Sequence, residues 1–468
     1  MLDLSFAPHS VNAADFGFLP ENSADENSAA LQAIVNRGGD IVIDVPGVYD
    51  LSETIRLGDD VSLRFGAGVY VRRALSADGT QHQGYVFVNR GAYERKYNQN
   101  ISITGLHLIA NGMEPSYENQ TESDMVTGLR AHLAFFYVRN LTIRDFELLD
   151  LGRCAFGIQI CTFENAILEN IHIEGGKDAL HFGKGSKFVV RHGLFRTFDD
   201  PIALNAHDYA TSNPQMGWIE NGVIEDCYDL DQESTTGFFC RILAGSWGDW
   251  TEGMVVRHSD SVVSDGRVYR VCMKPDGASY ISRTRPTHTD GAAELDGITW
   301  VMVQDDDPIY NCGCRNIHFK DIFLEKKRPV AFSVHFDNDK WSHSYYPDSE
   351  APVQKDLIFE NIFFLADVPV LITANAPVNA IKLINSVVEN SRVNLAHIDL
   401  PGLDYGRTHI LISGCTLRAH GETELVTAEP GREATLKILG SIVENEDMSA
   451  VVRGDVRVIS SDIPVKSE

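Results

Sequence analysis

A short phrase recurs through most of this chain: an alternating apolar run, a polar corner that is often asparagine, and a second alternating run. Copies begin at Asn100, Asn140 and Asn165, and the phrase returns at Asn316. Alternation indicates β-strands, and regular spacing without hairpin signals between them is typical of a solenoid. Inward residues would stack as aliphatic ladders, and the corner asparagines would hydrogen-bond along the axis. We therefore predict an all-β chain folded as a parallel β-helix.

Two stretches and one helix interrupt the repeat. The segment 28–36 predicts a helix that caps the first coil and covers its exposed edge. Residues 71–98 are expected to form a loop. Residues 245–311 are long enough for an inserted small β-module, so the predicted organisation is β-helix over 1–244, insertion over 245–311 and further β-helix coils over 312–468. The insertion is either a packing or oligomer contact or a platform for sugar rings, with the aromatic candidates Trp247, Trp250, Tyr269, Tyr280 and Trp300.

The charge of the chain limits its partners. It has 40 basic and 66 acidic residues, which gives a formal net charge of −26. Such a balance argues against nucleic acid or an anionic membrane surface as a main partner. No apolar run of about 18 residues occurs, so no membrane span is expected. An acidic sugar is still compatible with this charge, because a few local cations suffice to bind it.

Eight cysteines are spread thinly over 468 residues. Cys154, Cys161, Cys227 and Cys240 fall inside predicted strands, where a reduced thiol packs as a small apolar side chain. Cys312-Gly-Cys314 lacks a second ligand pair, so no metal site is expected. The start of the chain shows no basic region followed by an apolar one, so we expect a cytoplasmic protein unless a signal has been removed.

Carboxylates gather at one place in the repeat. Asp178 and Asp200 lie 22 residues apart, close to one coil, and Asp199 directly precedes Asp200. Neighbouring rungs lie about 4.8 Å apart, so the three side chains are expected to cluster. Glycoside hydrolysis with inversion needs an acid for the leaving oxygen and a base for water, and a third carboxylate helps keep the acid protonated. These residues are therefore predicted to be catalytic, although Asp-Asp also occurs where a strand simply ends in a turn.

The run from Leu129 to Asp208 resembles glycoside hydrolase family 28, the polygalacturonase-like right-handed parallel β-helices. Gly176-Lys177-Asp178 stands in the place of the family's Asn-Thr-Asp, and Phe198-Asp199-Asp200 matches its Asp-Asp coil. Cys240-Arg241-Ile242-Leu243 is similar to its Arg-Ile-Lys, and the opening at Val11 looks like the wider pectate-lyase-like superfamily. The resemblance implies that Asp199 is the general acid, that Asp178 and Asp200 position the water, and that Arg241 binds substrate. It also implies a right-handed solenoid and a mechanism without a cofactor.

The chain departs from that family in three places, one of which is the absence of its Gly-His-Gly coil, where His207 is the nearest histidine. Gly176 and Lys177 replace Asn and Thr, and Leu243 replaces the family's final Lys. The Lys-Arg pair is what the family uses on galacturonate carboxylates, so the departures argue against polygalacturonase activity and indicate a divergent glycosidase whose sugar the sequence does not name.

Several side chains near these coils are predicted to contact the substrate. Lys177 flanks Asp178, and a bend at the corner would present both side chains on one face. Arg153 lies on the rung before. A polar and aromatic loop after His335 is expected either to add a subsite wall or to bind a cation, and the subsite wall is favoured. The set of candidates, besides Arg241, is Lys177, His181, His207, Arg153 and Trp341; His207 is alternatively an ion-pair partner of Asp208.

Three functions follow from these patterns. The first is glycosidic hydrolysis of an oligosaccharide or polysaccharide, exo-acting because large loops can block one end of a cleft. The second is a polysaccharide lyase or epimerase on uronates. Such an enzyme needs a cation to neutralise the carboxylate and a base for the α-proton, and the candidates for these roles are Lys177, His181, His207 and Arg241. The third is a tailspike-like β-helix that binds glycans without turnover, through the insertion. The aspartate triplet favours the first, and a homo-oligomer stays open for all three.

Overall fold

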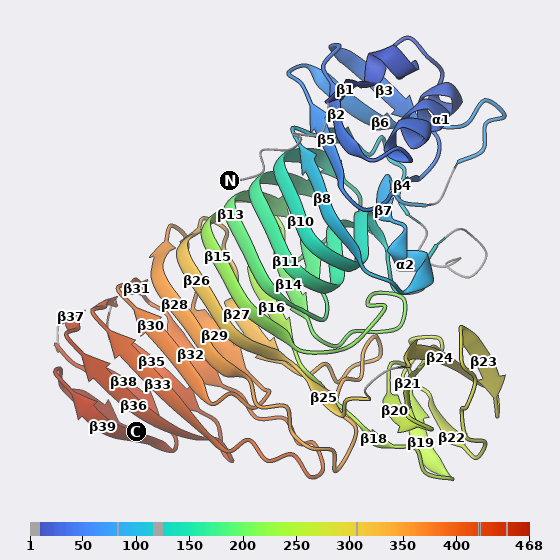
Figure 1. Ribbon diagram of the computed structural model, residues 1–468. Helices are drawn as coiled ribbons and strands as arrows, with labels where there is room; N and C mark the ends of the chain where they lie inside the picture. Colours follow the sequence, from blue (N-terminus) through green and yellow to red (C-terminus); the bar gives the residue numbers. More distant parts are fainter. Residues whose placement is uncertain are drawn as a thin grey trace, which may run out of the picture. The chain divides into compact units, whose positions relative to one another are not determined.

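The computed structural model describes residues 10–81, 84–115, 125–305, 308–419, 421, 423–445 and 448–468. It confirms the predicted all-β fold, a right-handed parallel β-helix with an N-terminal helix. The chain divides into two compact units, one of Met1–His181 with Lys187–Thr197 and the other of Phe182–Ser186 with Phe198–Glu468. Figure 1 labels their strands. Among the described residues, no helix has the length and apolar content needed to cross a membrane.

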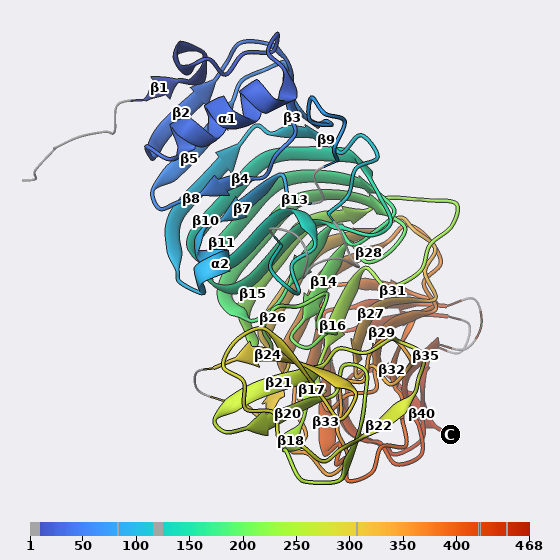
Figure 2. The ribbon, with the colours of Figure 1, turned by 90° about the vertical axis from the view of Figure 1, so that its right-hand side faces the viewer.

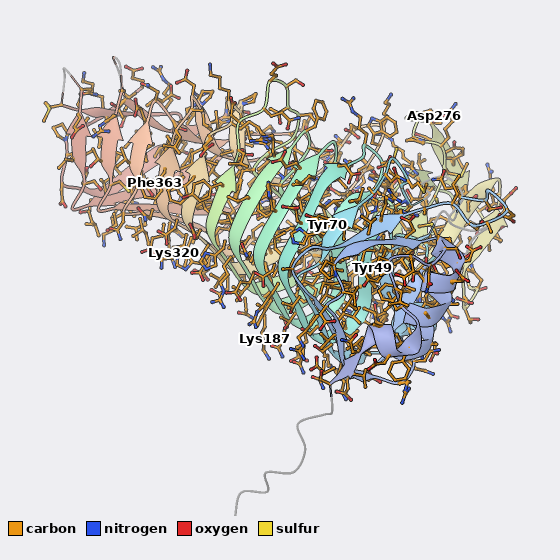
Figure 3. All side chains as sticks on the ribbon, turned by 90° about the horizontal axis from the view of Figure 1, so that it is seen from above. Tyr49, Tyr70, Lys187, Asp276, Lys320 and Phe363 are labelled. Atoms are coloured by element: carbon orange, nitrogen blue, oxygen red, sulfur yellow. The ribbon has the colours of Figure 1, made fainter. Side chains whose placement is uncertain are left out.

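The first unit is built on long parallel strands whose inward residues stack. Leu133 on β10 lies in register with Ile158 on β11, and Leu141 lies in register with Ala166; all four are buried. Between them, outward residues carry charge, such as Lys187 in Figure 3, which pairs with Glu164. The strands of this unit are β1 (Val11–Asn12), β2 (Gly39–Ile43), β3 (Gly47–Leu51), β4 (Ile55–Leu57), β5 (Val61–Phe65), β6 (Val69–Arg73), β7 (Phe87–Asn89), β8 (Asn98–Thr104), β9 (His107–Ile109), β10 (Ala131–Leu151) and β11 (Phe156–Gly175), while β12 (Leu180–Phe182) and β13 (Gly185–Thr197) carry the boundary between the units.

A helix covers the first strands, as predicted, but it begins earlier than expected. α1 runs over Ala24–Val35, and Ser23 and Glu26 form a reciprocal capping box that sets its start. Leu31 and Ile34 of α1 are buried, and Figure 2 shows the helix lying along β2 and β3. The expected start at Ser28 was wrong because the capping box of Ser23 and Glu26, and not the first residue of the apolar run, sets the start of the helix.

The predicted loop over 71–98 was also wrong in part. It contains β7 and the short helix α2 (Gly91–Glu94). Val86, Phe87 and Val88 are all buried, and β7 pairs with both β4 and β10. Burial on both sides removes the alternation by which a strand is recognised in a sequence.

The corner asparagines form the expected ladders. In the first unit, Asn165 Nδ2 donates to Asn140 Oδ1 at 3.1 Å, and Asn140 Nδ2 donates to Asn100 Oδ1 at 2.9 Å. All three adopt the left-handed conformation, with φ between 55° and 60°. The second unit also has a ladder of corner asparagines, since Asn316 Nδ2 donates to Asn221 Oδ1 at 2.8 Å. Asparagine suits these corners because it tolerates positive φ and carries both a donor and an acceptor.

The second unit continues the same rung pattern. β15 pairs in parallel with β26, although about 90 residues of chain separate them. The ring of Phe323 stacks on Tyr228 at a centroid distance of 4.2 Å and on Phe363 at 4.6 Å. Figure 3 labels Phe363. Its β-helix strands are β14 (Ile202–Asn205), β15 (Ile219–Asp229), β16 (Cys240–Leu243), β26 (Cys314–Leu324), β27 (Val330–His335), β28 (Lys355–Phe364), β29 (Val370–Ala374), β30 (Ala380–Ile384), β31 (Val387–Glu389), β32 (Arg392–Leu395), β33 (Arg407–Ser413), β34 (Thr416–Arg418), β35 (Thr423–Ala428), β36 (Glu433–Leu439), β37 (Ile442–Glu444), β38 (Ala450–Arg453), β39 (Val456–Ser461) and β40 (Val465–Ser467).

Between β16 and β26 the chain forms small separate sheets. Four of the aromatic residues proposed as a sugar platform, namely Trp247, Trp250, Tyr269 and Trp300, are buried, so their faces are not offered to a ligand. The predicted domain limits at 244 and 311 stay a prediction. The strands here are β17 (Gly245–Ser246), β18 (Gly248–Asp249), β19 (Met254–Arg257), β20 (Ser261–Ser264), β21 (Arg267–Val271), β22 (Ser279–Ser282), β23 (Ala292–Leu295), β24 (Ile298–Gln304) and β25 (Asn311–Cys312).

Three of the four cysteines expected in strands lie there. Cys161, Cys227 and Cys240 are buried on β11, β15 and β16. Cys154 is exposed and precedes β11, so placing it in a strand was wrong. The reason is the turn at residues 152–155, which interrupts the apolar run.

Candidate active site

Asp178 lies in the first unit at a bend that follows β11. The carboxylate is buried, with 1% of the residue exposed. Lys177 Nζ lies 3.3 Å from Asp178 Oδ1, and His181 Nδ1 lies 3.1 Å from Asp178 Oδ2. The bend therefore presents Lys177 and Asp178 on the same side, which a regular strand would not do.

An aromatic ring supports this group in the first unit. The His181 ring stacks on Phe156 at 4.0 Å, and the Arg130 guanidinium lies 4.5 Å from the centroid of the same ring. Neither Phe156 nor Arg130 was predicted from the sequence, because Phe156 lies one rung before His181 and Arg130 lies one rung before Phe156. Arg153 is exposed, and its stem covers Gly176, where an added Cβ would lie 2.6 Å from Arg153 Cγ.

Asp199 and Asp200 belong to the second unit, with carboxylate oxygens within 4.8 Å of each other. The Phe238 N–H donates to Asp200 Oδ1 at 2.7 Å. Gly237 precedes it with φ of +66°, and an added Cβ there would lie 2.3 Å from Asp200 Oδ1 and 2.8 Å from Asp199 Oδ1. Glycine is thus required both by its conformation and by the close approach of backbone to the two carboxylates.

Arg241 stands on β16 beside this pair. Its Nε lies 3.4 Å from Asp200 Oδ2, and its Nη2 lies 3.5 Å from Asp208 Oδ2. Asn205 completes the group: its Oδ1 accepts from Arg241 Nε at 3.3 Å, and its Nδ2 donates to Asp208 at 2.8 Å. The guanidinium therefore lies between two carboxylates.

His207 and Trp341 occupy different surroundings in the second unit. His207 is 1% exposed and lies 3.5 Å from Ser261 Oγ, and an added Cβ at Gly245 would touch its ring. Burial lowers the pKa of His207 well below its usual value, which disfavours the charged ring that an ion pair with Asp208 would need. Trp341 is 49% exposed on the loop that follows β27, with Lys340 Nζ 4.9 Å from its ring centroid.

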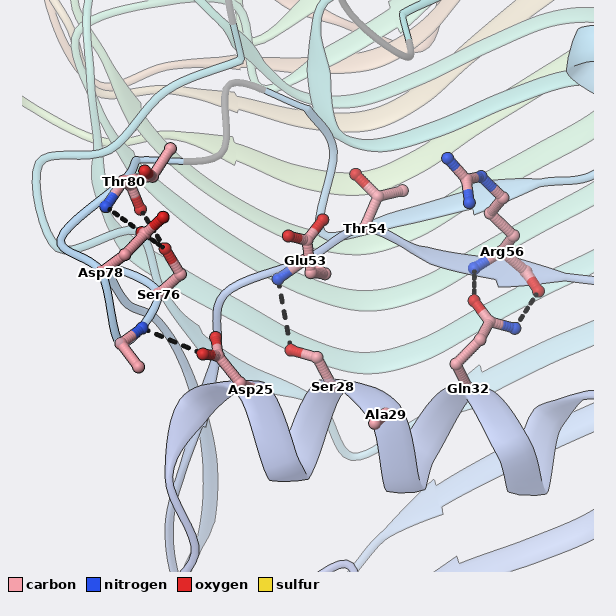
Figure 4. A pocket seen from close by; sticks show the side chains of 11 residues that line it. Asp25, Ser28, Ala29, Gln32, Glu53, Thr54, Arg56, Ser76, Asp78 and Thr80 are labelled. Atoms are coloured by element: carbon pink, nitrogen blue, oxygen red, sulfur yellow. Dashed lines mark hydrogen bonds between the residues drawn. The ribbon is translucent and has the colours of Figure 1, made fainter.

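A cavity of about 660 Å³ lies in the first unit between α1 and the chain that follows β3 (Figure 4). Its polar lining is largely engaged in holding the cap together. Asp25 accepts from the Ala77 N–H at 2.9 Å, and Gln32 Oε1 accepts from the Arg56 N–H at 2.8 Å. No residue predicted to be catalytic lines it, so we do not place the chemistry there.

Comparison with known proteins supports the fold. No family model and no curated protein sequence matches the chain. Among solved structures, the pre-mature gene product 12 of bacteriophage phi29 matches with a TM-score of 0.52 at 11% identity; the alignment covers 98% of this chain but only 56% of that one. A family 28 exopolygalacturonase of Yersinia enterocolitica matches with a TM-score of 0.41 at 12% identity, over 98% of this chain and 77% of that one.

The surface adhesin PfbA of Streptococcus pneumoniae also matches, with a TM-score of 0.47 at 14% identity, over 98% of this chain and 100% of that one. At these identities the likeness concerns the fold alone, and function has to be argued from the side chains.

Proposed function

We propose that this chain is a glycoside hydrolase of the polygalacturonase-like type that cleaves oligosaccharides with inversion. The observation that carries the proposal is the Asp199–Asp200 pair, whose carboxylate oxygens lie within 4.8 Å of each other. The backbone of Gly237 and Phe238 lies in close contact with both carboxylates. Two like charges this close oppose folding, and such groups cluster at functional sites. Paired carboxyl groups are the reactive groups of most glycosidases.

The surroundings of the two aspartates support different roles. Asp200 accepts a backbone hydrogen bond and faces the Arg241 guanidinium, so it suits an acceptor that orients the attacking water. Asp199 is half-buried and more accessible than Asp200, which suits the acid that protonates the leaving oxygen. We propose Asp178, one 22-residue step earlier, as the third carboxylate, held ready by His181 and Lys177.

The environment of Arg241 supports a neutral sugar as substrate. Asp200 and Asp208 flank its guanidinium, so its charge is largely offset before a substrate arrives. A uronate would meet little net attraction from this side chain, whereas hydroxyl groups can still accept from it. The substituted Leu243 points the same way, because it leaves no second cation at that position.

The first prediction concerns Asp199→Asn. We expect wild-type protein to release reducing sugar from at least one member of a panel of aryl glycosides and plant or microbial oligosaccharides. The variant should lose at least about 1000-fold in turnover, because an amide cannot donate the required proton. Asp226→Asn is the matched control: Asp226 occupies a corner of β15 with φ of 49°, where asparagine is favourable, and activity should persist.

Three results would contradict the hydrolase. Full activity in Asp199→Asn would show that Asp199 is not the general acid. A product that absorbs in the ultraviolet, or proton exchange without cleavage, would indicate a lyase or epimerase. Glycan binding that survives the loss of all three aspartates, with no turnover of any substrate, would indicate a binding protein.

A further inference from the structure

Three residues of the second unit form a hydrogen-bonded chain that the proposed hydrolysis of glycosidic bonds does not use. Ser333 and His335 lie on β27, and Asp337 follows two residues later. Ser333 Oγ lies 2.8 Å from His335 Nδ1, and His335 Nε2 lies 3.0 Å from Asp337 Oδ1. A hydroxyl, an imidazole and a carboxylate are thus linked in the order that activates a serine nucleophile.

Strand alternation brings these residues to one face. Phe332 and Val334 are fully buried in the solenoid core, so Ser333 and His335 lie on the opposite, outer face of β27. Ser333 is 2% exposed, whereas the side chains of His335 and Asp337 are 12% and 14% exposed. The imidazole and the carboxylate therefore reach solvent, and the hydroxyl is the most covered of the three.

Asp337 is held in place by its backbone. Its N–H donates to Ser344 Oγ at 2.9 Å, and the Ser344 N–H donates to the Asp337 carbonyl at 3.0 Å. Burial opposes its ionisation, but the hydrogen bond and charge of His335, together with the charge of Arg241, lower the pKa of Asp337 to about 2. An ionised carboxylate at this point stabilises a protonated imidazole.

We propose that Ser333, His335 and Asp337 form a second catalytic site, which hydrolyses short acyl esters of sugar hydroxyl groups. Ser333 Oγ attacks the ester carbonyl carbon, and its proton passes to His335 Nδ1. The bond between the acyl carbon and the sugar oxygen breaks, and that oxygen takes the proton from His335. Water, deprotonated by His335, then attacks the acyl-serine, which releases a carboxylic acid and restores the Ser333 hydroxyl.

The surroundings of Ser333 define the substrate class. Only 2% of Ser333 is exposed and the Phe238 ring lies 5.6 Å from the His335 ring, so we assign a small acyl group such as acetyl to the substrate. Arg241 lies opposite Ser333 in register on the neighbouring strand, about 4.8 Å away. Asp200 and Asp208 offset its charge, but its guanidinium N–H groups can still donate hydrogen bonds to the developing oxyanion.

The test measures ester hydrolysis by the full chain. We expect release of nitrophenol from p-nitrophenyl acetate, slower release from p-nitrophenyl octanoate, and release of acetate from an acetylated oligosaccharide. Ser333→Ala should lose at least about 1000-fold of this rate. Thr373→Ala is the matched control, because Thr373 occupies the same register position on β29; its rate should equal that of wild type.

A second readout follows the nucleophile directly. A fluorophosphonate should add one adduct to the intact wild-type protein, at the peptide that contains Ser333, and none to Ser333→Ala. If Ser333→Ala does not fold, as judged by circular dichroism, His335→Gln replaces it and should also abolish labelling. No acetate release by wild type, or unchanged release by the serine variant, would overturn the inference. Acetate release without any cleavage of glycosidic bonds would instead support the esterase site and contradict the proposed glycoside hydrolase activity.

Discussion

At the scale of single residues, the first unit contains a histidine whose burial has a consequence for stability. His132 on β10 is 0% exposed, and neither ring nitrogen has a hydrogen-bond partner among the described residues. Burial, assisted by the charge of Arg73, lowers the pKa of His132 to about 3. In the unfolded chain the ring would titrate near its ordinary value of 6.5.

We expect His132→Leu to reduce the acid sensitivity of the protein. Between pH 6.5 and 3 the unfolded chain binds a proton that the native His132 does not, so the free energy of unfolding falls as the pH drops through this window. The variant should lose about 2 kcal/mol less than wild type between pH 7 and 5, as measured by urea unfolding. Phe136→Leu, another buried change on the same strand, should destabilise equally at both pH values. An unchanged pH dependence in His132→Leu would contradict the expectation.

At the scale of elements, the corners hold consecutive rungs in register. Asn140 is the middle member of the ladder in the first unit and takes part in two amide hydrogen bonds, one to Asn100 and one to Asn165. Its left-handed φ of 55° would cost another residue about 1–2 kcal/mol. The corner therefore combines a conformational preference with a hydrogen-bonding pattern, and two substitutions separate these effects.

We expect Asn140→Ala to lower the free energy of unfolding by about 2–4 kcal/mol, since it removes both ladder hydrogen bonds and strains the backbone. Asn140→Gly should cost less, because glycine accepts the left-handed conformation and loses only the ladder. Thermal or urea unfolding of the two variants measures the difference. Equal losses would show that the backbone conformation contributes nothing at this corner.

At the scale of the whole molecule, the net charge of −26 influences which glycans approach. A polyanionic glycan is repelled by this field at low ionic strength, and the repulsion weakens as salt screens it. A neutral glycan feels no such field. The charge of the chain and the flanked Arg241 therefore act in the same direction.

We expect the association of a polyuronate with Asp199→Asn to strengthen as salt rises from about 10 mM to about 150 mM, where the Debye length falls from about 30 Å to about 8 Å. Affinity for a neutral oligosaccharide of similar length should stay constant. Calorimetry with both ligands at both salt concentrations makes the comparison. Polyuronate binding that weakens with salt would instead indicate a cationic binding site and would favour the lyase or epimerase.

Several interactions near the aspartates were beyond prediction from the sequence. The Asp199-Asp200 pair is visible as a motif, but its contact with Gly237 and Phe238 spans about 38 residues of chain and depends on the path of a turn. The stacking of His181 on Phe156 likewise joins side chains from different rungs. The hydrogen bonds from Ser333 to Asp337 join the end of β27 to the loop that follows it, and strand alternation does not specify where that loop places Asp337.

Local patterns in the sequence specify the solenoid. Alternation with a period of two, and asparagines at the corners, are local properties that specify strands and left-handed turns before any long-range contact forms. Which polar and aromatic side chains are buried depends instead on long-range packing. It placed Trp250 and Trp300 inside the insertion instead of on a binding surface, and it set Arg241 between Asp200 and Asp208. The physical reason is that burial and ion pairing depend on which segments meet in space, and a repeat pattern does not specify how loops between its strands pack.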